Sequence, residues 1–192
     1  MSLTINHQTN DISATSGSVT LDGAAVGGGG GAAVVVGHTT TSSSTSAVSF
    51  SSLDDTYISY RLVMNWYHSS AVSSYPDIRF YDGSTVLTGY QVQRYYGQNQ
   101  SNSTAQNDIS LLVETSQQYF SSAVNIWGIG HTNKPLILNA QSYGNASANA
   151  VAECGANLAA ASGVTPDKIE IRATWSDIPA GAEITLYGLK SS

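Results

Sequence analysis

The sequence predicts an all-β protein: an antiparallel, jelly-roll-like β-sandwich that follows an N-terminal arm rich in Gly, Ser and Thr. From residue 47 on, short segments of alternating apolar and polar residues recur, and turn residues separate them. The alternation of apolar and polar side chains gives each strand one apolar face for the core and one polar face for solvent, as two stacked sheets require. A chain of 192 residues is also long enough to bury one sizeable core. We therefore expect an arm and linker over 1–46, for attachment or contact between subunits, and a β-sandwich domain over 47–192.

The arm contains five consecutive glycines at 27–31. Such a run has high conformational entropy, so it fits a flexible hinge or a backbone that passes close to another chain. It does not fit a phosphate-binding loop, which needs a helix after it and a Lys-Ser/Thr pair. Residues 18–22 fit a short strand, residues 32–36 a buried strand, and residues 38–46 a Thr/Ser linker.

The strongest strand of the domain spans 56–68. Its predicted inward positions are Ile58, Tyr60, Leu62, Met64 and Trp66. A second strand at 77–81 leads through an Asp-Gly-Ser turn at 82–84 into a third at 85–96. Residues 97–107 are polar, and we expect a loop there.

Further strands are expected at 108–114, 122–129 and 134–139, and the last two are joined by a turn at 130–133. Residues 148–161 fit both a helical stripe and strand alternation. The pattern alone does not decide between them, and we favour a strand because glycine and asparagine weaken the helix.

The C-terminal stretch 168–190 is predicted to form two strands around a Pro-Ala-Gly turn. Ile169 and Ile171 share the inward face of the first strand, and Ile184 and Leu186 share that of the second. We expect the two strands to pair as a terminal hairpin whose apolar face needs an opposing sheet.

The charge balance excludes several classes of function. Lys plus Arg total 7, Asp plus Glu total 13, and the formal net charge is -6. The cations form no cluster, so we expect no nucleic-acid partner, which requires a basic stripe. No basic-then-apolar segment opens the chain and no run of about 18 apolar residues occurs, so we expect neither a secretory signal nor membrane insertion.

Only 10% of the residues are charged, against roughly 25% in an average soluble domain. A neutral polar surface is typical of proteins that assemble side by side in large extracellular or viral structures.

No pattern points to catalysis, so we expect a non-enzymatic protein without catalytic residues, metal or cofactors. The histidines lie far apart and lack ligand-spaced partners: His7, His38, His68 and His131. Asp54 and Asp55 fit a turn better than a calcium site.

The single cysteine, Cys154, cannot form an intrachain disulfide, and it fits a buried side chain better than a link between subunits or a reactive thiol. A glycoside hydrolase is a third class of function; it needs two facing carboxylates, and the chain has only four Glu.

The candidate binding residues are aromatic: Tyr95, Tyr96 and Trp127. Tyr95 and Tyr96 precede the polar stretch at 97–107. Flat aromatic faces suit sugar rings, and an amphipathic Tyr also suits a strand edge or a subunit seam, where its hydroxyl stays wet. We therefore predict contact with a glycan or with a second subunit at these residues.

Four short motifs occur in order along the domain: FSSLDDTY at 50–57, YRLVM at 60–64, RFYDGS at 79–84 and ITLYGLK at 184–190. In this order they resemble a family of small tailed-bacteriophage virion proteins, of the head or tail fibre or decoration type, whose domain ends in a Leu-Tyr-Gly-Leu-Lys strand. The resemblance implies a jelly-roll-like domain on the virion surface, often in trimers. It carries over no catalytic residue, since the motif positions belong to turns and core.

These observations predict a bacteriophage virion structural protein, a surface-displayed head decoration or fibre protein or a tail component, that acts by assembly. Its expected partners are copies of itself, as a homotrimer, and other virion proteins of the capsid or tail. Its expected location is the virion surface, after synthesis in the host cytoplasm. The alternative is a carbohydrate-binding tail-tip adhesin whose partner is a host surface glycan.

Overall fold

In the computed structural model the chain divides into two compact units, residues 1–32 with 191–192, and residues 33–190. The structure describes residues 3–6, 11–14, 20–21, 24–25, 33–72, 76–96, 99–111, 117–145, 149–159, 163–174 and 176–190. In the first unit, β1 (Leu3–Asn6) pairs with β2 (Asp11–Ala14), and β3 (Thr20–Leu21) pairs with β4 (Ala24–Ala25). β3 confirms the short strand expected at 18–22, whereas the glycines at 27–31 lie outside the described residues.

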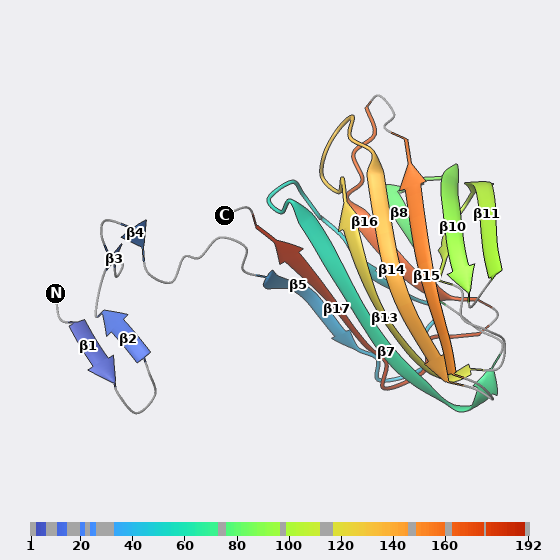
Figure 1. Cartoon of the computed structure of the whole chain (residues 1–192), viewed down its shortest axis with the longest axis horizontal. Helices are drawn as coiled ribbons and strands as arrows, with labels where there is room; N and C mark the ends of the chain where they lie inside the picture. The colour runs from blue at the N-terminus through green and yellow to red at the C-terminus, as the bar shows by residue number, and fades with distance from the viewer. Residues whose placement is uncertain are drawn as a thin grey trace. The chain divides into compact units, whose positions relative to one another are not determined.

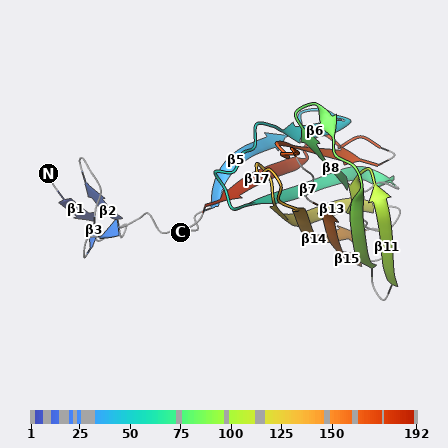
Figure 2. The same ribbon diagram turned by 90° about the horizontal axis from the view of Figure 1, so that it is seen from above.

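The second unit consists of two antiparallel sheets, and its described residues contain no helix. The strands are β5 (Ala33–Thr40), β6 (Ala47–Phe50), β7 (Ser59–Val72), β8 (Pro76–Asp82), β9 (Thr85–Val86), β10 (Tyr90–Tyr96), β11 (Asn99–Gln106), β12 (Ile109–Ser110), β13 (Gln117–Trp127), β14 (Leu136–Asn145), β15 (Asn149–Leu158), β16 (Lys168–Ala173) and β17 (Glu183–Leu189). The larger sheet has the order β11-β10-β15-β14-β13-β7-β17-β5, and the smaller has the order β12-β8-β16-β6, with β9 paired to β8. Figure 1 shows the larger sheet in front of β8 and β16, and Figure 2 shows β6 and β8 as a separate layer from β13, β14 and β15. The predicted all-β sandwich is therefore confirmed.

The core lies between the sheets, where their inward residues meet. Tyr60 and Met64 of β7 are at most 1% exposed, and so are Ile78 and Phe80 of β8. These positions confirm the inward faces predicted for both strands. Ile58 lies in the bend before β7 and is 57% exposed, so its predicted inward position was wrong.

The predicted terminal hairpin was also wrong. β16 pairs with β6 and β8 in the smaller sheet, whereas β17 pairs with β5 and β7 in the larger sheet. The segment between β16 and β17 crosses from one sheet to the other, and Ile178 and Thr45 exchange backbone hydrogen bonds there. Ile171 and Leu186 are both fully buried as predicted, because alternation defines the dry face of a strand but not its neighbour.

The structure corrects the loop predicted at 97–107 and decides the ambiguous segment 148–161. Residues 97–107 were expected to form a loop, yet 99–106 form β11, which pairs with β10 at the edge of the larger sheet. An edge strand can be exposed to solvent on both faces. For this reason β11 lacks the alternation of apolar and polar residues that identifies the other strands. Residues 149–158 form β15 between β10 and β14, which confirms the strand rather than the helix.

β5 forms the opposite edge of the larger sheet and pairs only with β17 among the described strands. It falls within the stretch 1–46 that the sequence analysis gave to the arm and linker. The strand predicted at 32–36 is present from residue 33 on, but it is not a fully buried strand. Val34 is 39% and Val35 55% exposed, whereas Val36 is partly buried against the core. The following residue, Thr41, ties this edge to the crossing segment, since its Oγ1 donates to the Pro179 carbonyl at 2.5 Å and accepts from the Ala182 amide at 2.9 Å.

Candidate binding face of the larger sheet

The outer face of the larger sheet, which is turned away from the smaller sheet, is almost free of charge. In the described strands, the register puts only three Asp, Glu, Lys or Arg side chains on this face: Arg61, Glu153 and Glu183. Much of the remainder consists of Asn, Gln, Ser, Thr and Tyr, among them Asn125 and Asn139, which lie opposite each other. A neutral face of this kind can approach a second surface without the desolvation cost of buried charge.

The smaller sheet carries the charge instead. Lys168 Nζ lies 3.6 Å from Glu170 Oε2 and 4.0 Å from the centre of the Tyr81 ring. Arg79 Nη2 lies 3.3 Å from Asp108 Oδ2. Since Ile78, Phe80, Ile169 and Ile171 point into the core, these alternating positions face outward. The two outer faces of the sandwich therefore differ sharply in charge.

Beside these ion pairs lies a buried carboxyl group, that of Asp77. Its Oδ2 accepts a hydrogen bond from Thr174 Oγ1 at 2.6 Å, while its Oδ1 has no partner among the described residues. Burial raises the pKa of this carboxyl, and the hydrogen bond from Thr174 opposes the shift. In the part of the chain that the structure describes, no three His, Cys, Asp or Glu side chains gather in a way that could hold a metal ion.

Three tyrosines form a patch at one end of the neutral face. Tyr67 of β7 lies opposite Tyr119 of β13, and their ring centroids are 5.7 Å apart. Tyr119 also pairs with Asn145, so Tyr143 of β14 is its diagonal neighbour. Tyr67 is 52%, Tyr119 53% and Tyr143 39% exposed. We call Tyr67, Tyr119 and Tyr143 the tyrosine patch.

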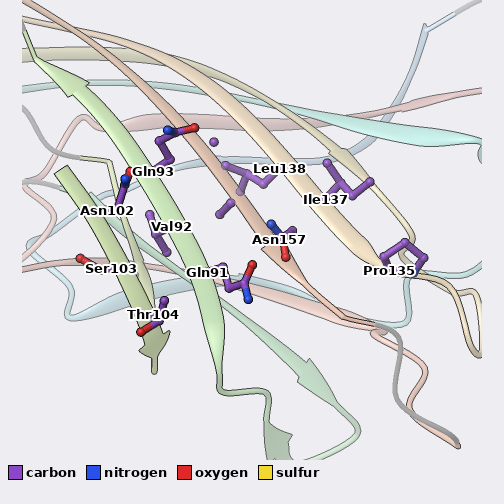
Figure 3. Close-up of a pocket in the computed structure, with 12 residues that line it drawn as sticks. Gln91, Val92, Gln93, Asn102, Ser103, Thr104, Pro135, Ile137, Leu138 and Asn157 are labelled. Carbon is purple, nitrogen blue, oxygen red and sulfur yellow. The ribbon is translucent and has the colours of Figure 1, made fainter. Parts of the chain in front are cut away.

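A shallow hollow lies at the other end of the same face, over β10, β11, β14 and β15 (Figure 3), and it encloses about 710 Å³. Its lining residues are all uncharged: Gln91, Val92, Gln93, Asn102, Ser103, Thr104, Pro135, Ile137, Leu138, Gly155, Ala156 and Asn157. Gly155 takes an outward position on β15, and a β-carbon added there would meet no atom within 4 Å. Gly155 therefore leaves part of the floor of the hollow without a side chain. We call it the amide hollow.

A β-bulge shapes the side of the amide hollow that β11 forms. The register between β10 and β11 shifts after Tyr90, and Ala105 in the bulged segment has a φ of 57°. A non-glycine residue in this left-handed region costs on the order of 1–3 kcal/mol, so the surrounding strands must hold it there. Bulges increase the local twist and redirect side chains. Thr104, which belongs to the bulged segment, lines the hollow.

Two of the predicted binding residues, Tyr95 and Trp127, border the hollow but do not line it. Tyr95 lies two residues beyond Gln93 on β10 and is 45% exposed, and Trp127 pairs with Ile137 of β14 and is 41% exposed. β15 and β14 separate β10 from β13, so at about 4.8 Å per strand the backbones of Tyr95 and Trp127 are at least roughly 14 Å apart. The side chain of Tyr96 lies outside the described part of the chain. The contact role of these residues therefore stays a prediction.

Sequence reasoning missed the residues of the hollow itself. Gln91 and Gln93 alternate with the buried Tyr90 and Val92, which marks them as outward-facing but no more. Gly155 was noted only as a residue that weakens a helix. Its significance depends on the register between strands that lie far apart in the sequence, and no local pattern carries that information.

The chain matches no protein-family model, and no curated protein matches its sequence. Within its described residues we find no helix with the length and apolar composition needed to cross a bilayer.

Proposed function

We propose that this chain is a structural protein of a bacteriophage particle, displayed on the virion surface as a head decoration or fibre protein or as a tail component. It acts by assembly with copies of itself, as a homotrimer, and with other virion proteins. The contrast between the two outer faces carries this proposal. A surface that must stay in water keeps its ion pairs, as the smaller sheet does around Lys168 and Glu170. The larger sheet offers neutral groups and tyrosines, which suit burial against another protein.

The tyrosine patch is the best candidate contact. Tyr is enriched at protein interfaces because its ring buries a large apolar area while its hydroxyl finds a partner or stays wet. Tyr67 and Tyr119 are more than half exposed and already pack against each other, so little side-chain freedom remains to be lost when a partner covers them.

The edge strand β5, two strands away from β7, offers a second contact on the same sheet. One side of β5 has no neighbouring strand among the described residues, and Val35 is 55% exposed. Unpaired edge strands with apolar side chains and no Lys or Pro are ready to pair with another chain. We therefore expect β5 to pair with a neighbouring subunit as well.

The motifs behind the family resemblance also support a structural role. The stretches 50–57 and 184–190 meet, since the Ile58 amide that follows the first donates to the Leu189 carbonyl at 2.9 Å. Tyr60 Oη donates to the Asp54 carbonyl at 2.8 Å, and the Tyr57 ring packs edge-on against Tyr60 with centroids 5.4 Å apart. The motif residues thus join the start of β7 to the end of β17, as turn and core residues do.

Sedimentation velocity on the full chain tests the assembly. We expect a trimer that the double variant Tyr67→Ser/Tyr119→Ser converts to a monomer. Ile137→Ser is the matched control, because Ile137 is a similarly exposed large side chain on the same face but lies outside the patch. A wild-type monomer, or a double variant that assembles like the wild type, would contradict the proposed contact.

A further inference from the structure

We propose that the amide hollow is a binding site for a neutral saccharide. This inference does not rest on the virion assignment, and it concerns the opposite end of the larger sheet from the tyrosine patch. Ile137 in the hollow and Tyr143 in the patch are six residues apart on β14, or about 20 Å at the usual rise per residue. The amide hollow and the tyrosine patch are therefore separate sites on the same face.

Two pairs of amide side chains converge on the hollow. Gln93 lies opposite Asn102 of β11, and Gln91 lies opposite Asn157 of β15. Figure 3 shows Gln93 beside Asn102, and Gln91 and Asn157 on the neighbouring strands β10 and β15. Between these pairs, Gly155 lies opposite Gln93 and leaves the backbone of β15 uncovered. A ligand can thus rest on the sheet itself with amides on two sides.

The chemistry of these groups suits hydroxyl-rich ligands. A primary amide offers two N–H donors and a carbonyl acceptor, and a sugar hydroxyl both donates and accepts. Within the described structure the side chains of Gln91, Gln93 and Asn157 take part in no hydrogen bond, so their donors and acceptors are open to a ligand. Gln100 Nε2 lies 3.4 Å from Asn102 Oδ1 and orients that amide.

The absence of charge in the lining narrows the ligand class. No Lys, Arg, His, Asp or Glu lines the hollow. Phosphate and carboxylate ligands are recognised through Arg, Lys or helix N-termini, so an anionic glycan or a nucleotide gains nothing here. A neutral sugar has no charge to desolvate and needs only the amides.

An apolar strip completes the site. Ile137 is 43% exposed beside Pro135, and Ile137 pairs across the strands with Trp127, which is 41% exposed. The C–H face of a pyranose can cover such side chains while its hydroxyls reach the amides. Trp127 lies one strand beyond the hollow, so we expect it to contact a second sugar unit rather than the first.

NMR titration of the full, ¹⁵N-labelled chain tests the inference, because the side-chain amide signals of Gln91, Gln93 and Asn157 report on the site directly. The probes are maltotriose, cellotriose, chitotriose and lactose, with 3′-sialyllactose as the acidic counterpart of lactose. We expect saturable shifts of these signals with at least one neutral probe, and roughly tenfold weaker binding after Asn157→Leu, as for the loss of one hydrogen bond.

Filling the hollow provides the decisive variant. Gly155→Val should abolish the shifts while leaving the melting temperature and the sedimentation behaviour of the wild type, since the new side chain meets open space. Gly155→Ala, a smaller change, should weaken binding if the valine variant does not fold. The inference is overturned if none of the neutral probes shifts the amide signals, if sialyllactose binds as well as lactose, or if binding survives in a folded Gly155→Val variant.

Discussion

Gly188 of β17 lies directly against the ring of Tyr57, so that a β-carbon added to Gly188 would overlap the ring carbons Cδ1, Cε1 and Cγ. Tyr57 also packs against Tyr60, which is 1% exposed and limits how the ring can move. We predict that Gly188→Ala lowers the free energy of unfolding by about 1–3 kcal/mol, as overpacking does elsewhere. Urea unfolding monitored by tryptophan fluorescence measures the change.

Gly155→Ala is the matched control for this prediction. Its β-carbon meets nothing within 4 Å, so its free energy of unfolding should stay within about 0.5 kcal/mol of the wild type. The double variant Tyr57→Ala/Gly188→Ala should cost less than the sum of its single changes, because removal of the ring relieves the overlap. Equal effects of Gly188→Ala and Gly155→Ala would contradict this account of Gly188.

Thr41 is predicted to hold the edge strand β5 to the segment that crosses between the sheets. Its hydroxyl is the partner of both the Pro179 carbonyl and the Ala182 amide, and Thr41 is 7% exposed. Thr41→Val leaves the Ala182 amide buried without that partner, so we expect a loss of about 1–3 kcal/mol in the free energy of unfolding. Thr40→Val, at an exposed neighbouring position, should change it little. A loss of similar size in both variants would speak against the bridging role of Thr41.

Asp77 should make stability fall as the pH rises. Because burial raises the pKa of its carboxyl above the ordinary value of 3.8, the folded protein binds the proton more tightly than the unfolded chain. The contribution of this carboxyl to the free energy of unfolding is therefore most favourable below pH 3.8. It is lost as the pH rises through the raised pKa of the folded state. We predict that Asp77→Asn gains stability relative to the wild type as the pH increases across this range, measured by thermal unfolding in matched buffers.

Asp54 provides a control of opposite sign. Hydrogen bonds from Thr56 lower the pKa of its carboxyl, so its contribution is present above 3.8 and is lost as the pH falls through the lowered folded pKa. Asp54→Asn should therefore lose stability relative to the wild type as the pH rises. If the two variants shift in the same direction, the burial argument for Asp77 fails.

Cys154 should be chemically inert in the folded protein. It is 3% exposed, and burial raises the pKa of its thiol to about 11, although Arg94 opposes the shift. The thiolate is the reactive species, so both effects slow the reaction with a disulfide reagent at mildly alkaline pH. We expect the reaction rate to rise steeply once denaturant unfolds the chain. Rapid labelling of the native protein, or a disulfide-linked dimer, would contradict this prediction.

The direction of side chains could be predicted from the sequence, but the pairing of strands could not. Ile171 and Leu186 point into the core as their alternation indicated, yet β16 and β17 belong to different sheets. Alternation of apolar and polar residues defines which face of a strand is buried. It does not define the neighbouring strand, because many strands with the same alternation could pair there. The turn at residues 179–181 looked like that of a hairpin, although it lies in a segment that spans the sandwich.

The candidate site was predictable only at its border. Tyr95 and Trp127 stand out in a sequence because large aromatic residues are few, and both lie beside the hollow. In the sequence, Gln93 and Gly155 look like any other solvent-facing strand residues. Only the register between the strands shows that they lie opposite each other. Such a contact joins β10 to β15 across about 60 residues of chain, a separation that no local periodicity can report.

A density map of intact bacteriophage particles, purified from the source of this chain, tests the proposed virion role most directly. We predict that the chain is present on the particle surface, with Tyr67 and Tyr119 covered by a neighbouring subunit and the charged face of the smaller sheet in solvent. Absence of the chain from purified particles, or a particle in which that tyrosine pair faces solvent in every copy, would contradict it.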